Sequence, residues 1–363
     1  MRNLEPQDLT STPVDIETFI KDPNYLGNAF MDIYPYWLDV LKDVYADPLR
    51  SRYTDVILAG SLGMGRSYAV VAGFLYDLYI ITLVKNPHEK WTLLPTTSID
   101  MAIFVGNTEN YFDDVVLDAL SISPYFRSTL LPGKGSILEE NMFPNNIGII
   151  TAPCRRFYIG RAVVGAIFDC EVEDNKEGSE IAHCYENCRR RVITRFMGAD
   201  GIVPCRMWTV SSSSGLLNSF LKDHIDAIRF DDHKKVVEPS IWDVNWHKGV
   251  YSGDTFTVFV GDDTTEPRIL NDNEIVDDSY NGRVIRVPVE YRKDFVRDVY
   301  ASLLYLAGIP VQNPMTQRPV LTYRDDKLEP FVFLEKKDIR LILVFAGFFV
   351  MFVLGVFYGM LGV

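Results

Sequence analysis

The stretch TDVILAGSLGMGRSYAV, residues 54–70, joins an apolar run to a glycine-rich turn and then to a helix-forming segment. It fits the pattern G-x-x-x-x-G-K-[ST] at Gly60, Gly65 and Ser67, but Arg66 stands where the pattern has lysine. In such a loop the backbone N–H groups and the helix N-terminus bind phosphates, and the serine hydroxyl ligates Mg²⁺. The alternative is a glycine-rich turn between a strand and a helix that binds no ligand.

A second apolar run, VVGAIFDC at residues 163–170, ends in a carboxylate. A strand of this kind places its terminal acid, here Asp169, against the magnesium ion of a bound nucleotide. The next position usually holds the glutamate that activates water, but in this chain it is Cys170, so Glu171 is the candidate for that role. The alternative is that these acids are solvated loop residues.

Four serines, residues 211–214 in CRMWTVSSSSG, follow a further predicted strand. At the tip of a strand their hydroxyl groups could sense the γ-phosphate of a nucleotide. A serine run is also an ordinary loop and helix-capping composition.

The formal net charge of −13 argues against broad electrostatic attraction to nucleic acid, so DNA contact would require a local basic face. Five cysteines and a polar N-terminus, MRNLEPQDLTSTP, indicate a reducing compartment and no signal peptide. Cys184 and Cys188, with His183 in AHCYENC, could be metal ligands, but without a second ligand pair they are more typical of packing residues.

The order of apolar runs predicts an α/β protein with a mainly parallel sheet covered on both faces. Predicted strands at 54–60, 98–107, 146–154, 163–170 and 205–212 are joined by predicted helices at 67–84, 111–122, 180–197 and 215–228. We expect an N-terminal helical segment at residues 1–50, a core domain at 51–238 and a smaller subdomain at 239–325. The subdomain is predicted to hold strand-like segments at 251–262 and 283–291 and a helix at 294–308.

The segment LILVFAGFFVMFVLGVFYGMLGV, residues 341–363, carries no charge and follows three basic residues. A helix of this length reaches ~35 Å, which exceeds a hydrocarbon core of ~30 Å. The pattern predicts a C-terminal transmembrane helix with the body of the protein on the cytoplasmic side.

An ordered set of motifs resembles the ATPase portion of the large terminase subunit of tailed bacteriophages, from about residue 33 to 309. The set comprises PYWLDVLKDVY, ILAGSLGMGRSYAV, YDLYIITLVKNPHE, SPYF, VVGAIFDCE, ENCRRRVITRFMG, MWTVSSSSG with SFLKDHID, YSGDTFTVFVGD and VPVEYRKDFVRDVYASLLYLAG. The resemblance implies a RecA-like P-loop NTPase with a small lid subdomain at 239–325. It also implies a motor that packages double-stranded viral DNA in the host cytoplasm, as a homo-oligomeric ring with a portal and a small terminase subunit as partners.

The resemblance also implies site residues and cofactors, which are ATP and Mg²⁺. The ATP phosphates would be held by Gly60, Gly63, Gly65, Arg66 and Ser67, and Mg²⁺ by Ser67 and Asp169. Arg66 and Glu171 would act in hydrolysis, and Ser212 and Ser213 would couple it to movement. The arginines of CRRRVITRF (Arg189, Arg190, Arg191 and Arg195) would face DNA or a neighbouring subunit's nucleotide, or else form a solvated helix face.

Two departures from the family pattern leave other readings open. Arg66 and Cys170 replace the residues most directly tied to hydrolysis, so we expect ATP binding with weakened turnover. The family continues into a nuclease domain, for which this chain has no room, so no nuclease activity is expected of it. One alternative is a non-hydrolysing nucleotide-binding or assembly protein tethered to a membrane through residues 341–363. Another is a frameshift or intron product with an accidental apolar tail.

Overall fold

The computed structural model describes residues 3–30, 33–105, 111–130, 141–153, 161–170, 175–211, 219–262, 264–271, 274 and 283–311. By its internal contacts the chain divides into Met1–Val320 and Leu321–Val363, and all described residues belong to the first unit. The predicted transmembrane helix at 341–363, Glu171, Ser212 and Ser213 lie outside the described residues. Among the described helices, none has the length and apolar character that crossing a bilayer requires.

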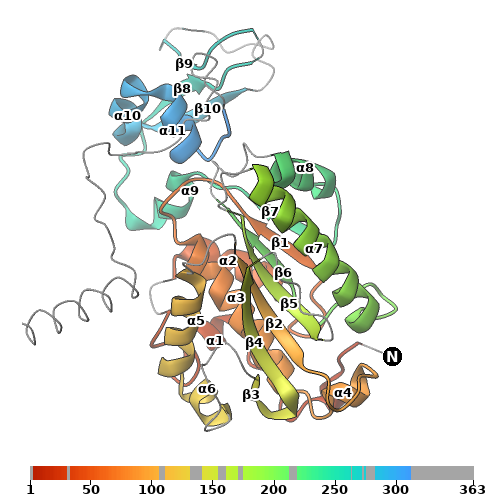
Figure 1. Cartoon of the computed structure of the whole chain (residues 1–363). Helices are drawn as coiled ribbons and strands as arrows, with labels where there is room; N and C mark the ends of the chain where they lie inside the picture. The colour runs from red at the N-terminus through yellow and green to blue at the C-terminus, as the bar shows by residue number, and fades with distance from the viewer. Residues whose placement is uncertain are drawn as a thin grey trace, which may run out of the picture. The chain divides into compact units, whose positions relative to one another are not determined.

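A seven-stranded sheet with the order β3-β4-β2-β5-β6-β1-β7 forms the centre of the fold (Figure 1). Its strands are β1 (Asp55–Leu58), β2 (Ile99–Val105), β3 (Asn141–Phe143), β4 (Ile147–Pro153), β5 (Ala162–Asp169), β6 (Met207–Val210) and β7 (Lys234–Val237). All neighbours pair in parallel except β3, which is antiparallel to β4 at one edge. The prediction of a mainly parallel α/β sheet is therefore confirmed.

Helices cover both faces of this sheet (Figure 1). They are α1 (Ile16–Lys21), α2 (Pro35–Val44), α3 (Arg66–Thr82), α4 (Pro87–Lys90), α5 (Tyr111–Ile122), α6 (Pro124–Thr129), α7 (Asn175–Phe196) and α8 (Ser219–Ile228), and a short helix, α9 (Ile241–Asn245), follows β7. Alternation along β1 shows the two layers: Val56 and Leu58 pack with α1, α2, α3 and α5, whereas Ile57 and Ala59 pack with α7 and α8. Both faces of β1 are buried, which explains its unbroken apolar sequence.

A second, three-stranded antiparallel sheet follows, with the order β10-β8-β9. It consists of β8 (Thr255–Phe259), β9 (Arg268–Ile269) and β10 (Val284–Pro288), with α10 (Arg292–Arg297) and α11 (Val299–Tyr305) packed on it. The single helix predicted at 294–308 is wrong, because Asp298 has extended backbone angles and its carboxylate caps the start of α11 by accepting from the N–H of Ala301. We call residues 239–311 the small subdomain.

Candidate functional site

The loop between β1 and α3 has the backbone geometry that its glycines allow. Gly60 has φ +108° and Gly65, which caps the N-terminus of α3, has φ +76°, both values that residues with a side chain rarely adopt. A Cβ at Gly60 would also lie 2.5 Å from the carbonyl oxygen of Pro239. The chain therefore requires glycine at these positions in order to turn directly from a buried strand into a helix.

The N–H groups of this loop divide into two sets. In the first half, the N–H of Ser61 donates to the carbonyl of Pro239 at 3.2 Å, and the N–H of Leu62 donates to the carbonyl of Tyr305 at 3.0 Å. In the second half, the N–H groups of Gly63, Met64, Gly65 and Ser67 have no acceptor within the part of the chain that the structure describes. These four donors lie at the N-terminus of a 17-residue helix, which is a favourable place for an anion.

A cavity of about 720 Å³ opens beside these donors. Its lining comprises the loop and helix start (Gly63, Met64, Gly65, Arg66, Ser67 and Tyr68), the segment before α2 (Asn28, Ala29, Phe30, Ile33 and Tyr34), and Tyr111 of α5. Its aromatic walls suit a flat ring, and its loop side suits phosphates. Burial, followed by a hydrogen bond with the hydroxyl of Tyr68, raises the pKa of Tyr111 to about 12, so the Tyr111 phenol stays a neutral hydrogen-bonding group at pH 7.

Helix α2 holds the loop from the other side. The indole Nε1 of Trp37 donates to the carbonyl of Met64 at 2.5 Å, and the ring of Tyr34 lies against the α-carbon of Gly65. Trp37 is almost fully buried, so this hydrogen bond is shielded from water. Neither residue was predicted as part of the site.

The side chain of Arg66 turns inward, toward the carboxyl ends of the strands of the central sheet. It is only 7% exposed, and its Nη1 donates to the carbonyl of Gly60 at 3.2 Å and to the carbonyl of Ser211. Ser211 directly follows β6, so the guanidinium connects the loop to the tip of the neighbouring strand. Both hydrogen bonds are donated by Nη1, so this end of the guanidinium is engaged by backbone carbonyls.

The predicted carboxylate, Asp169, also lies at the carboxyl ends of the strands. Asp169 ends β5 and pairs with Val210 of β6, and Leu58 of β1 pairs with the same residue from the other side. The N–H of Cys170 donates to the carbonyl of Val210 at 2.9 Å, and the hydroxyl of Ser211 donates to the carbonyl of Cys170 at 3.2 Å. The carboxyl ends of β1, β6 and β5 therefore meet beside the loop, as they do at ligand sites of parallel sheets.

The candidate magnesium ligands are few. Ser67 lies in the first turn of α3 on the cavity wall, and Asp169 lies at the sheet edge. No group of three or more histidine, cysteine or acidic residues suited to a metal occurs among the described residues. Because Mg²⁺ keeps several waters and takes only one or two protein carboxylates or hydroxyls, this sparse set is compatible with it. Cys184 and Cys188 belong to α7 and are buried in the core, as expected for packing residues.

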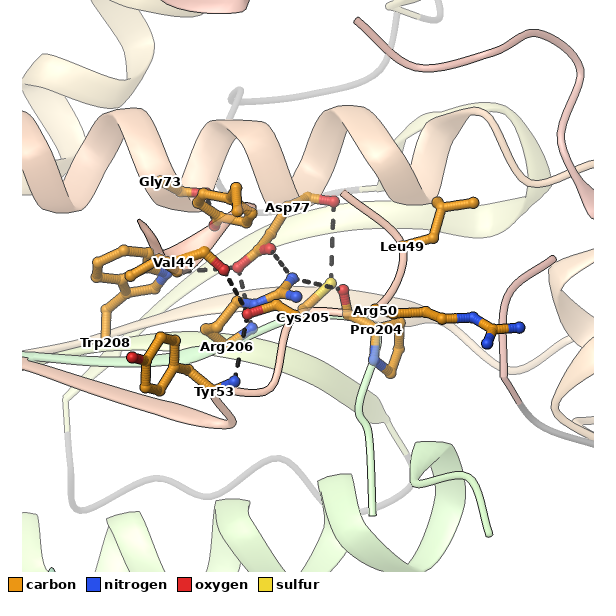
Figure 2. Close-up of polar contacts among 12 residues, drawn as sticks. Val44, Leu49, Arg50, Tyr53, Gly73, Asp77, Pro204, Cys205, Arg206 and Trp208 are labelled. Carbon is orange, nitrogen blue, oxygen red and sulfur yellow. Dashed lines mark hydrogen bonds and ion pairs between the residues drawn. The ribbon is translucent and has the colours of Figure 1, made fainter. Parts of the chain in front are cut away.

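A buried ion pair fixes α3 against β6 (Figure 2). Asp77 points from α3 toward the strand, where its Oδ1 accepts from Nη1 of Arg206 at 2.6 Å and its Oδ2 accepts from the N–H of Arg206 at 2.9 Å. Nε1 of Trp208 also donates to Oδ2, at 3.4 Å. Burial raises the pKa of Asp77, and the Arg206 guanidinium opposes that rise. Helix α3 begins at the loop, and β6, which directly follows Arg206, ends one residue before Ser211, so the pair fixes the two sides of the site relative to each other.

The arginines of α7 lie at the other end of the strands. Nη1 of Arg195 donates to the carbonyl of Arg161, just before β5, and Arg189 lines a pocket of about 170 Å³ with Asp55 and Lys234. These neighbours mark the amino ends of β1, β5 and β7. Within one chain the cluster is therefore separated from the loop by the length of the sheet.

No protein-family model matches this chain, and no curated protein matches it. Among solved structures, the chain is similar to the large terminase of bacteriophage HK97. The TM-score is 0.42 and the sequence identity is 13%, and the alignment covers 62% of this chain. The chain spans 43% of the length of that terminase. A similarity of this size does not show membership of a family.

The structure thus brings together Gly60, Gly63, Gly65, Arg66, Ser67 and Asp169, all of which the sequence had marked. It adds a contact with the small subdomain that the sequence did not predict. A Cβ on Gly308, just after α11, would lie 2.8 Å from the nitrogen of Ser61, so the end of α11 packs directly on the loop. The only signal was the glycine after a helical pattern in YLAGIP, which indicates a helix end but not what it contacts.

Proposed function

We propose that this chain binds Mg-ATP at the β1–α3 loop and acts as an ATPase subunit of a viral DNA-packaging motor. The observation that carries the ATP site is the set of backbone N–H groups at Gly63, Met64, Gly65 and Ser67. They lie at the N-terminus of α3, line a cavity large enough for a nucleotide, and have no acceptor among the described residues. The assignment to DNA packaging rests on the order of motifs that resembles large terminase subunits.

In this proposal each part of the site has a separate task. The loop N–H groups hold the phosphates, and the aromatic walls formed by Tyr34, Tyr68 and Tyr111 enclose the base. Ser67 and Asp169 hold the magnesium ion, which neutralises phosphate charge when bound. Glu171 positions the attacking water.

Arg66 sets the rate in this scheme. Its Nη1 is engaged by the carbonyls of Gly60 and Ser211, and the planar guanidinium cannot imitate the compact ammonium of lysine. We therefore expect ATP binding with slow hydrolysis. As in the family it resembles, the chain would work on double-stranded DNA as a ring, with a portal and a small terminase subunit as partners.

Calorimetric titration of the full-length protein with Mg-ATP tests the site. Gly63→Asp places a negative charge in the cavity, and Gly201→Asp is its matched control, because both glycines have positive φ (+69° and +81°) and nothing within 4 Å of a Cβ. A unit charge about 5 Å from a phosphate costs about 3 kcal/mol at an effective dielectric constant of 20, so Gly63→Asp should weaken ATP binding more than tenfold. Gly201→Asp should bind ATP like the wild type.

If the wild-type protein does not bind ATP, or if both variants lose affinity equally, the nucleotide site is wrong. Binding without any phosphate release would instead support a non-hydrolysing nucleotide-binding protein.

A further inference from the structure

A lysine of the small subdomain lies beside the wall of the nucleotide cavity. Nζ of Lys248 donates to the hydroxyl of Tyr34 at 3.2 Å and lies 4.6 Å from the centroid of the same ring. That ring is part of the cavity wall, and its edge approaches the β1–α3 loop, because a Cβ on Gly65 would lie 3.6 Å from Cε2 of Tyr34. A single aromatic ring therefore connects the ammonium of Lys248 to the start of α3.

The segment that carries Lys248 is anchored to the site at two points. The carbonyl of Pro239 accepts from the N–H of Ser61 in the loop, and α9, which starts two residues later, packs against α2. A 3₁₀ turn follows α9 and ends at Lys248. In the same turn the ring of His247 lies 5.1 Å from the ring of Tyr34, measured between centroids. These contacts hold the turn against the cavity wall.

The β1–α3 loop lacks the lysine that usually binds the β- and γ-phosphates of a nucleotide. Residues 54–70 contain no lysine, and position 66 holds arginine. Nη1 of Arg66 donates to the carbonyls of Gly60 and Ser211. Arg66 is also the only charged residue among the described residues that line the cavity. A second cation beside the loop would therefore stabilise phosphate charge that the loop alone leaves unbalanced.

Lys248 is available for that task. It is exposed, it forms no ion pair within the described part of the chain, and its hydrogen bond to Tyr34 uses one of the three donors of the ammonium. The nearest acid along the chain, Asp243, instead accepts from the N–H and the hydroxyl of Ser240 at 3.0 and 2.6 Å and caps α9. The described lining of the cavity contains no acid, so no carboxylate there opposes a bound phosphate.

We propose that Lys248 contacts the β- and γ-phosphates of the bound nucleotide and supplies the compact ammonium that the loop lacks at position 66. A rotamer change of this long side chain moves the ammonium from the hydroxyl of Tyr34 toward the loop, while the backbone of the small subdomain stays in place. The inference rests on the proposed ATP site. It makes the small subdomain, together with the loop, a part of that site.

The test is calorimetric titration of the full-length protein with Mg-ATP and with AMP. Lys248→Gln removes the charge. The matched control, Arg52→Gln, removes an exposed cation that also donates to a tyrosine hydroxyl and lies 4.6 Å from the ring centroid, but at Tyr53, outside the cavity lining. A hydrogen bond between charged groups contributes about 10- to 100-fold to affinity, so Lys248→Gln should weaken ATP binding by that factor. AMP has no β- or γ-phosphate, so its affinity should not change. The control should bind both ligands like the wild type.

Tyr34→Phe separates contact with phosphate from support of the cavity wall. It removes the hydroxyl that Nζ contacts but keeps the ring, so the ratio of ATP to AMP affinity should stay at its wild-type value. Equal losses of ATP and AMP affinity in Lys248→Gln would overturn the proposal, because the lysine would then only position Tyr34. Wild-type ATP affinity in Lys248→Gln would also overturn it. A wild-type protein that binds no ATP would refute the nucleotide site itself, so the two failures are distinguishable.

Discussion

Replacing Asp77 by asparagine should destabilise the protein by about 3–5 kcal/mol, the cost of leaving one charge of a buried ion pair without its partner. The substitution barely changes the side-chain volume, so it leaves no cavity to add to this cost. It removes the negative charge facing Arg206, whose side chain is 1% exposed, and it offers an NH₂ group in place of one of the two oxygens that now accept hydrogen bonds. Nε of Arg206 already has no acceptor among the described residues, and the carbonyl of Pro204, which accepts from Nη1 at 3.0 Å, carries no charge that could replace the carboxylate.

Guanidinium chloride unfolding at pH 7, followed by tryptophan fluorescence, measures the loss directly, because Trp208 contacts the same carboxylate. The double variant Asp77→Leu with Arg206→Met removes both charges and should recover much of the lost stability, since apolar residues often replace buried ion pairs without penalty. A loss below about 1 kcal/mol in Asp77→Asn would refute the reasoning, because it would mean that water or another group already compensates Arg206. So would a double variant as unstable as the single one.

Three further predictions concern the site and the pH dependence of stability. Arg66→Lys should increase the rate of phosphate release, because the compact ammonium of lysine can reach the β- and γ-phosphates, whereas the guanidinium is held at Nη1 by the Gly60 and Ser211 carbonyls, and an unchanged rate with ATP binding intact would contradict this role of Arg66. Asp169→Asn should weaken Mg-ATP binding in calorimetry but not magnesium-free ATP binding, and equal losses in both titrations would argue against a magnesium ligand. Burial, followed by the charge of Lys234, lowers the pKa of His224 to about 4 from 6.5, so the unfolded chain binds a proton first as the pH falls from 6.5 to 4. Roughly 3 kcal/mol of stability should be lost over that window and retained in His224→Leu, as measured by urea unfolding, and the same loss in the variant would rule out His224 as the cause.

The sequence predicted the central strands and helices because burial on both faces leaves a clear pattern. It missed β7, whose sequence KKVV begins with two lysines and does not look like a buried strand. In the structure Lys234 lies opposite Asp55 of β1, and its Nζ is 3.9 Å from Oδ2 of Asp55. The outermost strand on this side of the sheet therefore begins with a charged residue.

The loop between β1 and α3 was predictable because its glycines form a short motif within a few residues of sequence. The residues that contact the loop were not predictable. Trp37, Pro239 and Tyr305 reach the loop from three distant parts of the chain, and two of the three contacts use backbone carbonyls, which leave no trace in the identity of a residue. The inward orientation of Arg66 was equally hidden, because it depends on a carbonyl at the tip of another strand.

The hydrogen bonds from Ser61 and Leu62 to Pro239 and Tyr305 also set an order of events during synthesis. At the usual speed of translation, the ribosome needs on the order of 10–50 s to pass from the donors to the last of their acceptors. The residues of β1 and α3 are synthesised long before then, but the N–H of Leu62 has no acceptor until Tyr305 has been synthesised. A nascent chain stopped ahead of α11 would carry every residue of the glycine motif and still lack the acceptor that fixes its shape.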